Sequence, residues 1–237
     1  MKRALLVAIL YSITLVALAQ TVIEKAWTTS ATAEGLQQID TRITELVTKL
    51  DQHHYRNDVQ KLHALFTKTH STFLHSYVQY TGIEELAKGR YDCLTATSLF
   101  ADILGRTGFK FNIIETNYHI FIMVDAKDGD VLLETTDRIA GFIDNPEKIE
   151  KVIGQYRQNI LAGANAEQYQ YNFSLFKKVD VDQLPGLLYF NQAVKAFNSE
   201  KWDECSQKLS AAAMSTNSPH VAALTELLHR QPYFSGR

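Results

Sequence analysis

The chain has 237 residues, of which 46% are hydrophobic and 21% charged, and its formal net charge is −2. This composition excludes a disordered chain and is enough for one or two domains with a sizeable core. The nearly balanced charge argues against a nucleic acid as partner. Two cysteines are too few for a disulfide scaffold, so an apolar core must hold the fold.

Residues 1–19 have the parts of a secretory signal. Two basic residues precede an apolar run, residues 4–19, which ends in the small-x-small pattern Ala-Leu-Ala. As a helix this run rises about 24 Å, less than the roughly 30 Å hydrocarbon core of a bilayer, which favours a cleaved signal over an uncleaved anchor. We therefore expect cleavage before Gln20 and a periplasmic or extracellular protein that meets the membrane only during export. The two cysteines could pair in such an oxidising compartment.

Residues 34–80 predict amphipathic helices, because apolar side chains recur at steps of three and four. The histidines of this part are His53, His54, His63, His70 and His75. No consistent i, i+4 pair and no cysteine completes a ligand set around them. We therefore expect no metal site here and interpret these histidines as solvated or helix-capping residues.

The middle of the chain predicts a helix followed by an antiparallel sheet. The helix begins at Cys93 and ends near Gly105 and Gly108. Strands are expected at 109–115, 119–125 and 130–136, and a further helix at 146–162. The predicted fold class is therefore α+β, with N-terminal helices before the sheet.

The C-terminal part, residues 181–237, predicts a helical hairpin. Residues 189–219 resemble one tetratricopeptide repeat, a helix–turn–helix of about 34 residues, with Ala193 where glycine is usual. A single hairpin cannot bury its own apolar face, so we expect it to pack on the main domain, and it could bind a partner protein. Cys205 stands where such repeats have a small buried residue and is interpreted as structural.

Cys93 is the strongest candidate for chemistry. Free backbone N–H groups and the dipole at a helix start favour a thiolate, and a nucleophilic thiol also needs a base. Among the histidines only His119 begins a predicted strand, which fixes the direction of its side chain. The acid that would orient its ring is Glu134 or Asp137, on the strand that pairs with the strand of His119.

The turn of this hairpin decides between the two acids. A two-residue turn at 128–129 places Glu134 on the same face as His119, since opposite residues have a constant number sum. A three-residue turn with a glycine bulge favours Asp137 instead. The residues themselves leave both turns open.

Three segments carry a family resemblance: "YDCLTATSLFADILGRTGFKF", "NYHIFIMV" and "VLLETTD". A cysteine at a helix start, a histidine on the next strand and an acid at the end of the following strand resemble the transglutaminase-like superfamily, over about residues 70–140. The resemblance implies a papain-like core within residues 20–180 and a Cys–His–acid order. Glu134-Thr135-Thr136 would be the counterpart of the family's Asp-x-Thr, with Glu in place of Asp, which favours Glu134.

The resemblance implies an exported acyl-transfer enzyme: a peptidase, amidase or transglutaminase that acts on a protein or peptide through a Cys93 thioester. The backbone N–H of Cys93 would be one oxyanion donor, with Tyr91 and Asn117 as candidates for a second. Tyr91 and Tyr118 could line a substrate groove or be half-buried packing residues, and no cofactor is expected. The alternative is a non-catalytic exported module of the same fold, whose helical hairpin binds a partner protein.

Overall fold

The computed structural model describes residues 33–158 and 174–235. The predicted signal peptide, residues 1–19, lies outside the described residues, as does the end of the helix predicted at 146–162. Within the described part, no helix is both long and apolar enough to cross a membrane. The structure is mixed helix and sheet, which confirms the α+β class.

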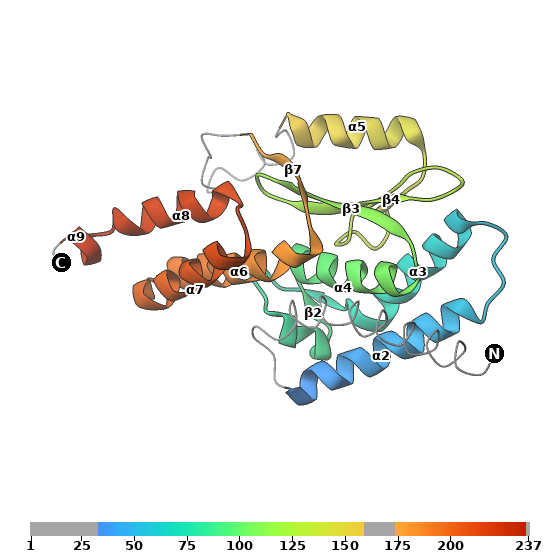
Figure 1. Cartoon of the computed structure of the whole chain (residues 1–237), viewed down its shortest axis with the longest axis horizontal. Coiled ribbons are helices and arrows are strands. Elements are labelled where there is room, and N and C mark those ends of the chain that lie inside the picture. Colours follow the sequence, from blue (N-terminus) through green and yellow to red (C-terminus); the bar gives the residue numbers. More distant parts are fainter. Residues whose placement is uncertain (1–32, 159–173, 236–237) are drawn as a thin grey trace, which may run out of the picture.

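An antiparallel five-stranded sheet with the order β6-β5-β4-β3-β7 forms the centre of the molecule (Figure 1). Its strands are β3 (Lys110–Thr116), β4 (Ile120–Asp125), β5 (Val131–Leu133), β6 (Phe142–Ile143) and β7 (Phe176–Val179). A small parallel pair is formed by β1 (Ser76–Tyr77) and β2 (Arg90–Tyr91). The first two predicted strands match β3 and β4. The third ends earlier than predicted, at Leu133, and β7 was not predicted.

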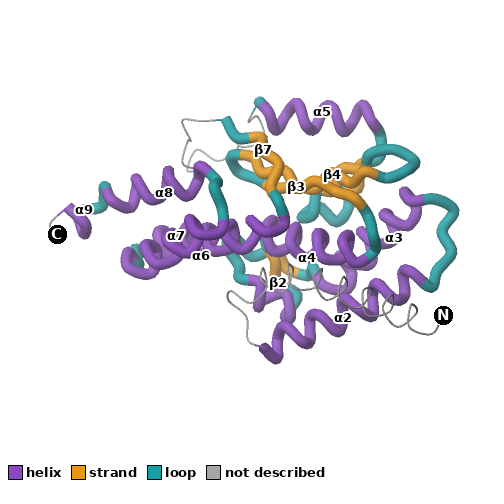
Figure 2. The backbone as a smooth tube through the Cα atoms, in the orientation of Figure 1, coloured by secondary structure: helices purple, strands orange, loops and turns teal. Residues whose placement is uncertain are grey.

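Helices cover both faces of the sheet, as Figure 2 shows in purple against orange. One face is covered by α4 (Cys93–Arg106), behind which α2 (Ala33–Asp51) and α3 (Asp58–Phe73) form a further layer, and the other face is covered by α5 (Pro146–Arg157). A short 3-10 helix, η1, spans Ile83–Lys88. Nearly every side chain of α4 is buried. This is expected of a largely apolar helix that lies between the sheet and the α2–α3 layer.

Strand alternation gives the sheet two different apolar faces. Ile120, Ile122 and Val124 belong to the large core that includes α4, whereas Phe121 and Leu132 pack against α5. Successive side chains of a strand point to opposite faces, so residues with the parity of Phe121 face α5. His119 precedes β4 and has that parity.

The C-terminal helices lie beside the end of the sheet. The 3-10 helix η3 (Val181–Gln183) leads into α6 (Leu184–Asn198), followed by α7 (Trp202–Ser215), α8 (Pro219–His229) and α9 (Pro232–Ser235). Leu184, Leu187 and Leu188 of α6 belong to the large core, whereas Ala193 and Ala196 belong to a second core with Cys205. The helical hairpin is therefore joined to the main core through the first half of α6.

The histidines of the N-terminal helices require one correction. His70 is neither solvated nor a cap: it is fully buried, with its ring 4.6 Å from that of Phe66 and 5.6 Å from that of Phe100. The sequence pattern missed this because one histidine on an apolar helix face gives no sign of how deep that face is buried. Among the described residues no group of three His, Cys, Asp or Glu side chains could hold a metal ion.

Candidate active site

Cys93 is the first residue of α4 and is partly exposed. The residue before it, Asp92, caps the helix: its carboxylate accepts the backbone N–H of Thr95 at 2.8 Å, and the Thr95 hydroxyl accepts the N–H of Asp92 at 2.8 Å. Such reciprocal capping fixes the first turn of a helix. The cap explains why the helix begins at this cysteine, as the sequence predicts.

His119 is held by a tight turn between β3 and β4. The Thr116 backbone N–H donates to the carbonyl of His119 at 2.8 Å, and the N–H of His119 donates to the Thr116 hydroxyl at 3.0 Å. These bonds fix the backbone of His119 at the start of β4. The ring is 20% exposed.

Glu134 follows β5 at the point where the chain leaves the sheet. Its N–H donates to the Gly141 carbonyl at 2.7 Å, and a Cβ on Gly141 would lie 2.2 Å from the Glu134 carbonyl oxygen. The neighbouring Thr135 hydroxyl is fully buried and lies 3.0 Å from that of Thr97 in α4. The loop and α4 together therefore fix the position of Glu134.

The hairpin turn differs from both of the turns considered from the sequence. Met123 pairs with Leu132, and the N–H of Gly129 donates to the carbonyl of Ala126, so the two central residues of the turn are 127 and 128. The turn is thus one residue earlier than the predicted 128–129. The number sum remains odd, and Glu134 therefore keeps the same face as His119.

Cys93, His119 and Glu134 lie together in the structure. The Nε2 of His119 is 2.7 Å from a carboxylate oxygen of Glu134, and Cys93 lies close enough to the ring to influence its pKa. Since Nε2 faces Glu134, we infer that Nδ1 faces the sulfur. Burial by itself lowers the pKa of His119, but its interactions with Cys93 and Glu134 raise it to about 10.

The other predicted acid is elsewhere. Asp137 is exposed, and one of its oxygens accepts the backbone N–H groups of Ile139 and Ala140, both at 2.9 Å. Its carboxylate therefore stabilises the loop after Glu134. The hydrogen-bond partner of His119 is Glu134 and not Asp137.

Tyr156 is a site residue that sequence reasoning missed. Its ring stacks on His119 at 5.6 Å and on Phe121 at 5.0 Å, and its phenol lies near the carboxylate of Glu134. Burial, followed by the nearby charge of Glu134, raises the pKa of this phenol. Ile149 and Tyr156 lie seven residues apart on one face of α5, so its orientation toward the sheet was predictable. Its place over His119 was not.

Cys93 and His119 open into a cleft of about 610 Å³. Tyr77, Tyr80, Asn117 and Tyr118 also line it, and further lining residues come from α6 and α8. Burial and then the charges of Cys93 and Asp92 raise the pKa values of Tyr77 and Tyr80. Two protonated phenols therefore lie close to the sulfur.

Two residues considered as second oxyanion donors have other contacts. Tyr91 is buried and packs edge-on against Tyr77, with ring centroids 5.9 Å apart. Asn117 is buried, and its side-chain oxygen accepts the backbone N–H of Leu175. Asn117 lines the cleft but is partly committed to holding the segment before β7.

Comparisons of the chain with protein-family models, with curated proteins and with solved structures find no match.

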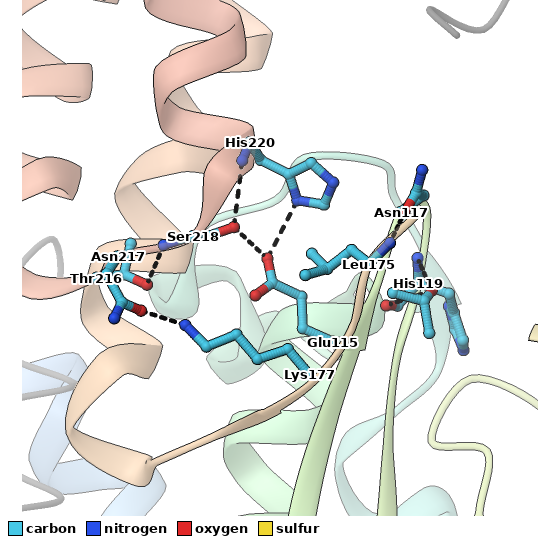
Figure 3. Close-up of polar contacts among 10 residues, drawn as sticks. Glu115, Asn117, His119, Leu175, Lys177, Thr216, Asn217, Ser218 and His220 are labelled. Atoms are coloured by element: carbon cyan, nitrogen blue, oxygen red, sulfur yellow. Dashed lines mark hydrogen bonds and ion pairs between the residues drawn. The ribbon is translucent and has the colours of Figure 1, made fainter. Parts of the chain in front are cut away.

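A second polar cluster lies at the same end of the sheet (Figure 3). The Ser218 hydroxyl donates to Glu115 at 2.6 Å, and the Nδ1 of His220 is 3.1 Å from the same oxygen. All three residues are buried. Because the hydroxyl donates to the carboxylate and not to the imidazole, the cluster lacks the arrangement of a serine nucleophile. It attaches the start of α8 to β3.

Proposed function

We propose that the chain is a cysteine-dependent acyl-transfer enzyme, a peptidase, amidase or transglutaminase, that acts on a protein or peptide. The observation that supports this most is the contact series from Cys93 at a helix start through His119 to Glu134. A thiol, an imidazole and an orienting carboxylate in this order are what thiol acyl transfer needs. We also propose that the helix, the sheet and this site form a papain-like core of the transglutaminase-like superfamily.

In the resting site His119 carries the proton, since its pKa is raised to about 10. An imidazolium beside a sulfur can form an ion pair with a thiolate, and Cys93 attacks in this nucleophilic form. The sulfur attacks the acyl carbonyl carbon, so that a C–S bond forms and the carbonyl electrons move to the oxygen. When the bond to the leaving group breaks, His119 gives its proton to the departing amine.

The resulting thioester is then opened by water or by an amine. His119 takes a proton from this second nucleophile, and the sulfur leaves as the thiolate, which restores the starting state. Glu134 keeps the ring oriented through Nε2 and stabilises the imidazolium in both steps. Whether water or an amine enters decides between hydrolysis and crosslinking.

The oxyanion needs hydrogen-bond donors that are fixed beforehand. The carboxylate of Asp92 accepts the N–H of Thr95, whereas Cys93 is the first residue of α4 and its N–H belongs to the free end of the helix. We propose this N–H as one donor. The phenols of Tyr77 and Tyr80 are candidates for the second, in place of Tyr91 and Asn117.

Export belongs to the same proposal. Residues 1–19 would be removed before Gln20, and the protein would work in the periplasm or outside the cell. The N-terminal sequence of the protein recovered from the producing cells tests this: Gln20 as first residue is expected, and an intact Met1 in the exported fraction would contradict it.

The test of the chemistry is the alkylation rate of Cys93 by iodoacetamide across pH, read by mass spectrometry. Cys205 is an internal reference, because it is fully buried and burial raises the pKa of its thiol to about 11. At pH 6.5 we expect Cys93 to react at least about 100-fold faster than Cys205.

The His119→Ala variant should lose most of this reactivity while keeping the circular dichroism spectrum of the wild type. If Cys93 is inert, is bonded to Cys205, or reacts equally well without His119, the enzyme proposal fails. The chain would then be a binding module of the same architecture.

A further inference from the structure

The cleft beside Cys93 is an open trough between two C-terminal helices. From α6 it is lined by Leu187, Phe190, Asn191, Val194, Phe197 and Asn198, and from α8 and its end by His220, Leu224, Leu227 and Gln231. The α6 residues are spaced by three and four, so one face of that helix forms the wall. Figure 2 shows both helices extending from the same side of the sheet.

A hydrogen bond places the reactive sulfur along this trough. The side chain of Asn191 donates to Asp92, the neighbour of Cys93, at 2.9 Å. From Asn191 to Asn198 the helix rises about 10 Å, which corresponds to about three residues of extended peptide. An acyl group held at Cys93 would therefore lie at one end of the apolar trough, whose wall continues along Val194 and Phe197.

Along α6 and α8 the trough is lined by apolar and uncharged polar side chains and by His220. Of the described residues that line the cleft, none is Lys or Arg, and the two carboxylates, Asp92 and Glu115, are buried and hydrogen-bonded. Beyond His119, which faces Glu134 and Cys93, an acidic ligand would find no Lys or Arg side chain there, and a basic one would find no exposed carboxylate. Amide side chains at the edges, such as Gln79 and Asn198, offer donors and acceptors to a peptide backbone.

The outer wall of the trough is fixed to the sheet. Ser218 and His220, at the start of α8, both bond Glu115 of β3, and the ring of His220 stacks on Phe190 of α6 at 5.7 Å (Figure 3). Glu115 precedes the turn that holds His119. The start of α8, the wall from α6 and the turn that holds His119 are therefore joined through β3. Such a preformed site favours binding of a substrate, because little has to be ordered on binding.

We propose that this trough binds an uncharged, apolar polypeptide segment of about three residues next to the acyl carbon that Cys93 attacks. The inference rests on the proposed acyl-transfer function and names its substrate class. Leucine- or valine-rich segments would fill the channel along Val194, Phe197 and Leu227, with their backbone bonded at the polar edges.

The experiment measures peptide binding separately from chemistry, in the full chain with Cys93→Ala. Three fluorescein-labelled pentapeptide amides, with alternating Leu-Ala, Glu-Ala and Lys-Ala sequences, are titrated and followed by fluorescence anisotropy. We expect the Leu-Ala peptide to bind at least about tenfold more tightly than the two others.

A charge placed in the trough should reverse this preference. Adding Val194→Asp should weaken binding of the Leu-Ala peptide at least about tenfold and strengthen binding of the Lys-Ala peptide. The matched control is Ala222→Asp, on an exposed part of α8 outside the cleft, which should change neither. A gain for the Lys-Ala peptide cannot arise from misfolding.

Three outcomes would overturn the inference: equal binding of the three peptides, tightest binding of a charged one, or the same effect from Ala222→Asp. A dimer that Val194→Asp dissociates in sedimentation would assign the trough to a second copy and also overturn it. The two proposals fail separately. If the Leu-Ala peptide binds preferentially but Cys93 is inert, the acyl-transfer proposal fails. If Cys93 is reactive but no preference is found, only the proposal of a peptide-binding trough fails.

Discussion

Two histidines of this protein, one fully and one largely buried, have opposite surroundings. His70 lies between Phe66 and Phe100, and neither of its ring nitrogens has a hydrogen-bond partner among the described residues. Its pKa is lowered to about 4, first by burial and then by the charge of Arg138. His119 is hydrogen-bonded to Glu134 and lies beside Cys93, and its pKa is raised to about 10.

The difference shows that partners, more than burial, decide the charge of a histidine. Burial penalises the charged form of both rings. Around His70 little offsets this penalty, so the ring is neutral and acts as an apolar aromatic. Around His119 the two acidic groups more than offset this penalty, so the ring is protonated. Each prediction below changes one side of this contrast.

The largest effect is expected at His70. Its folded-state pKa is about 4 against 6.5 in the unfolded chain, so its contribution to stability is present above pH 6.5 and is lost as the pH falls to 4. The shift corresponds to about 3 kcal/mol. The His70→Leu variant should lack this loss, measured by urea unfolding at pH 7 and pH 4.

Exposed His75 provides the control, because it lies near His70 in the sequence but outside the buried core that surrounds it. His75→Leu should keep the acid sensitivity of the wild type. Equal pH dependence of His70→Leu and the wild type would show that His70 has a partner and would remove the contrast.

A smaller effect is expected when the acid of the charged histidine is removed. Glu134→Gln keeps a hydrogen-bond acceptor for Nε2 but removes the negative charge. Loss of one neighbouring charge lowers the pKa of His119 by about one to two units at such a distance. The proton that His119 and Cys93 share then rests more often on the sulfur, so alkylation of Cys93 at pH 6 should slow by up to about 10- to 100-fold.

Asp137→Asn is the matched control for that change, because the amide oxygen still accepts the two loop N–H groups. It should alter the alkylation rate less than twofold by the reasoning that exposed, screened charges act weakly. If Asp137→Asn slows the reaction and Glu134→Gln does not, the orienting acid has been misassigned.

The smallest effect is expected at Tyr156, which covers the charged ring. Tyr156→Phe keeps the stacking on His119 and removes only the phenol oxygen near Glu134, so Cys93 alkylation should slow by less than about tenfold. Tyr156→Ala also exposes the ring of His119 to water and should slow the alkylation of Cys93 more. A Phe variant as impaired as the Ala variant would point to a role of the hydroxyl itself.

The fold was predictable where the pattern is local. The helix that begins at Cys93 follows from an Asp cap and an apolar run, and β3 and β4 follow from their apolar, β-branched residues. β7 was not predictable, because a short strand paired with β3 depends on a partner more than 50 residues away. The burial of His70 and the place of Tyr156 also depend on distant segments.

The sequence by itself determined the fold class, the start of the cysteine helix, the strand that follows His119 and the two candidate acids. These depend on propensity, capping and alternation within a few residues. Only the tertiary structure decided that Glu134 faces His119, that Tyr156 covers it and that α6 and α8 enclose the cleft. The physical reason is that turn register and packing between distant elements are set by contacts that no single segment encodes.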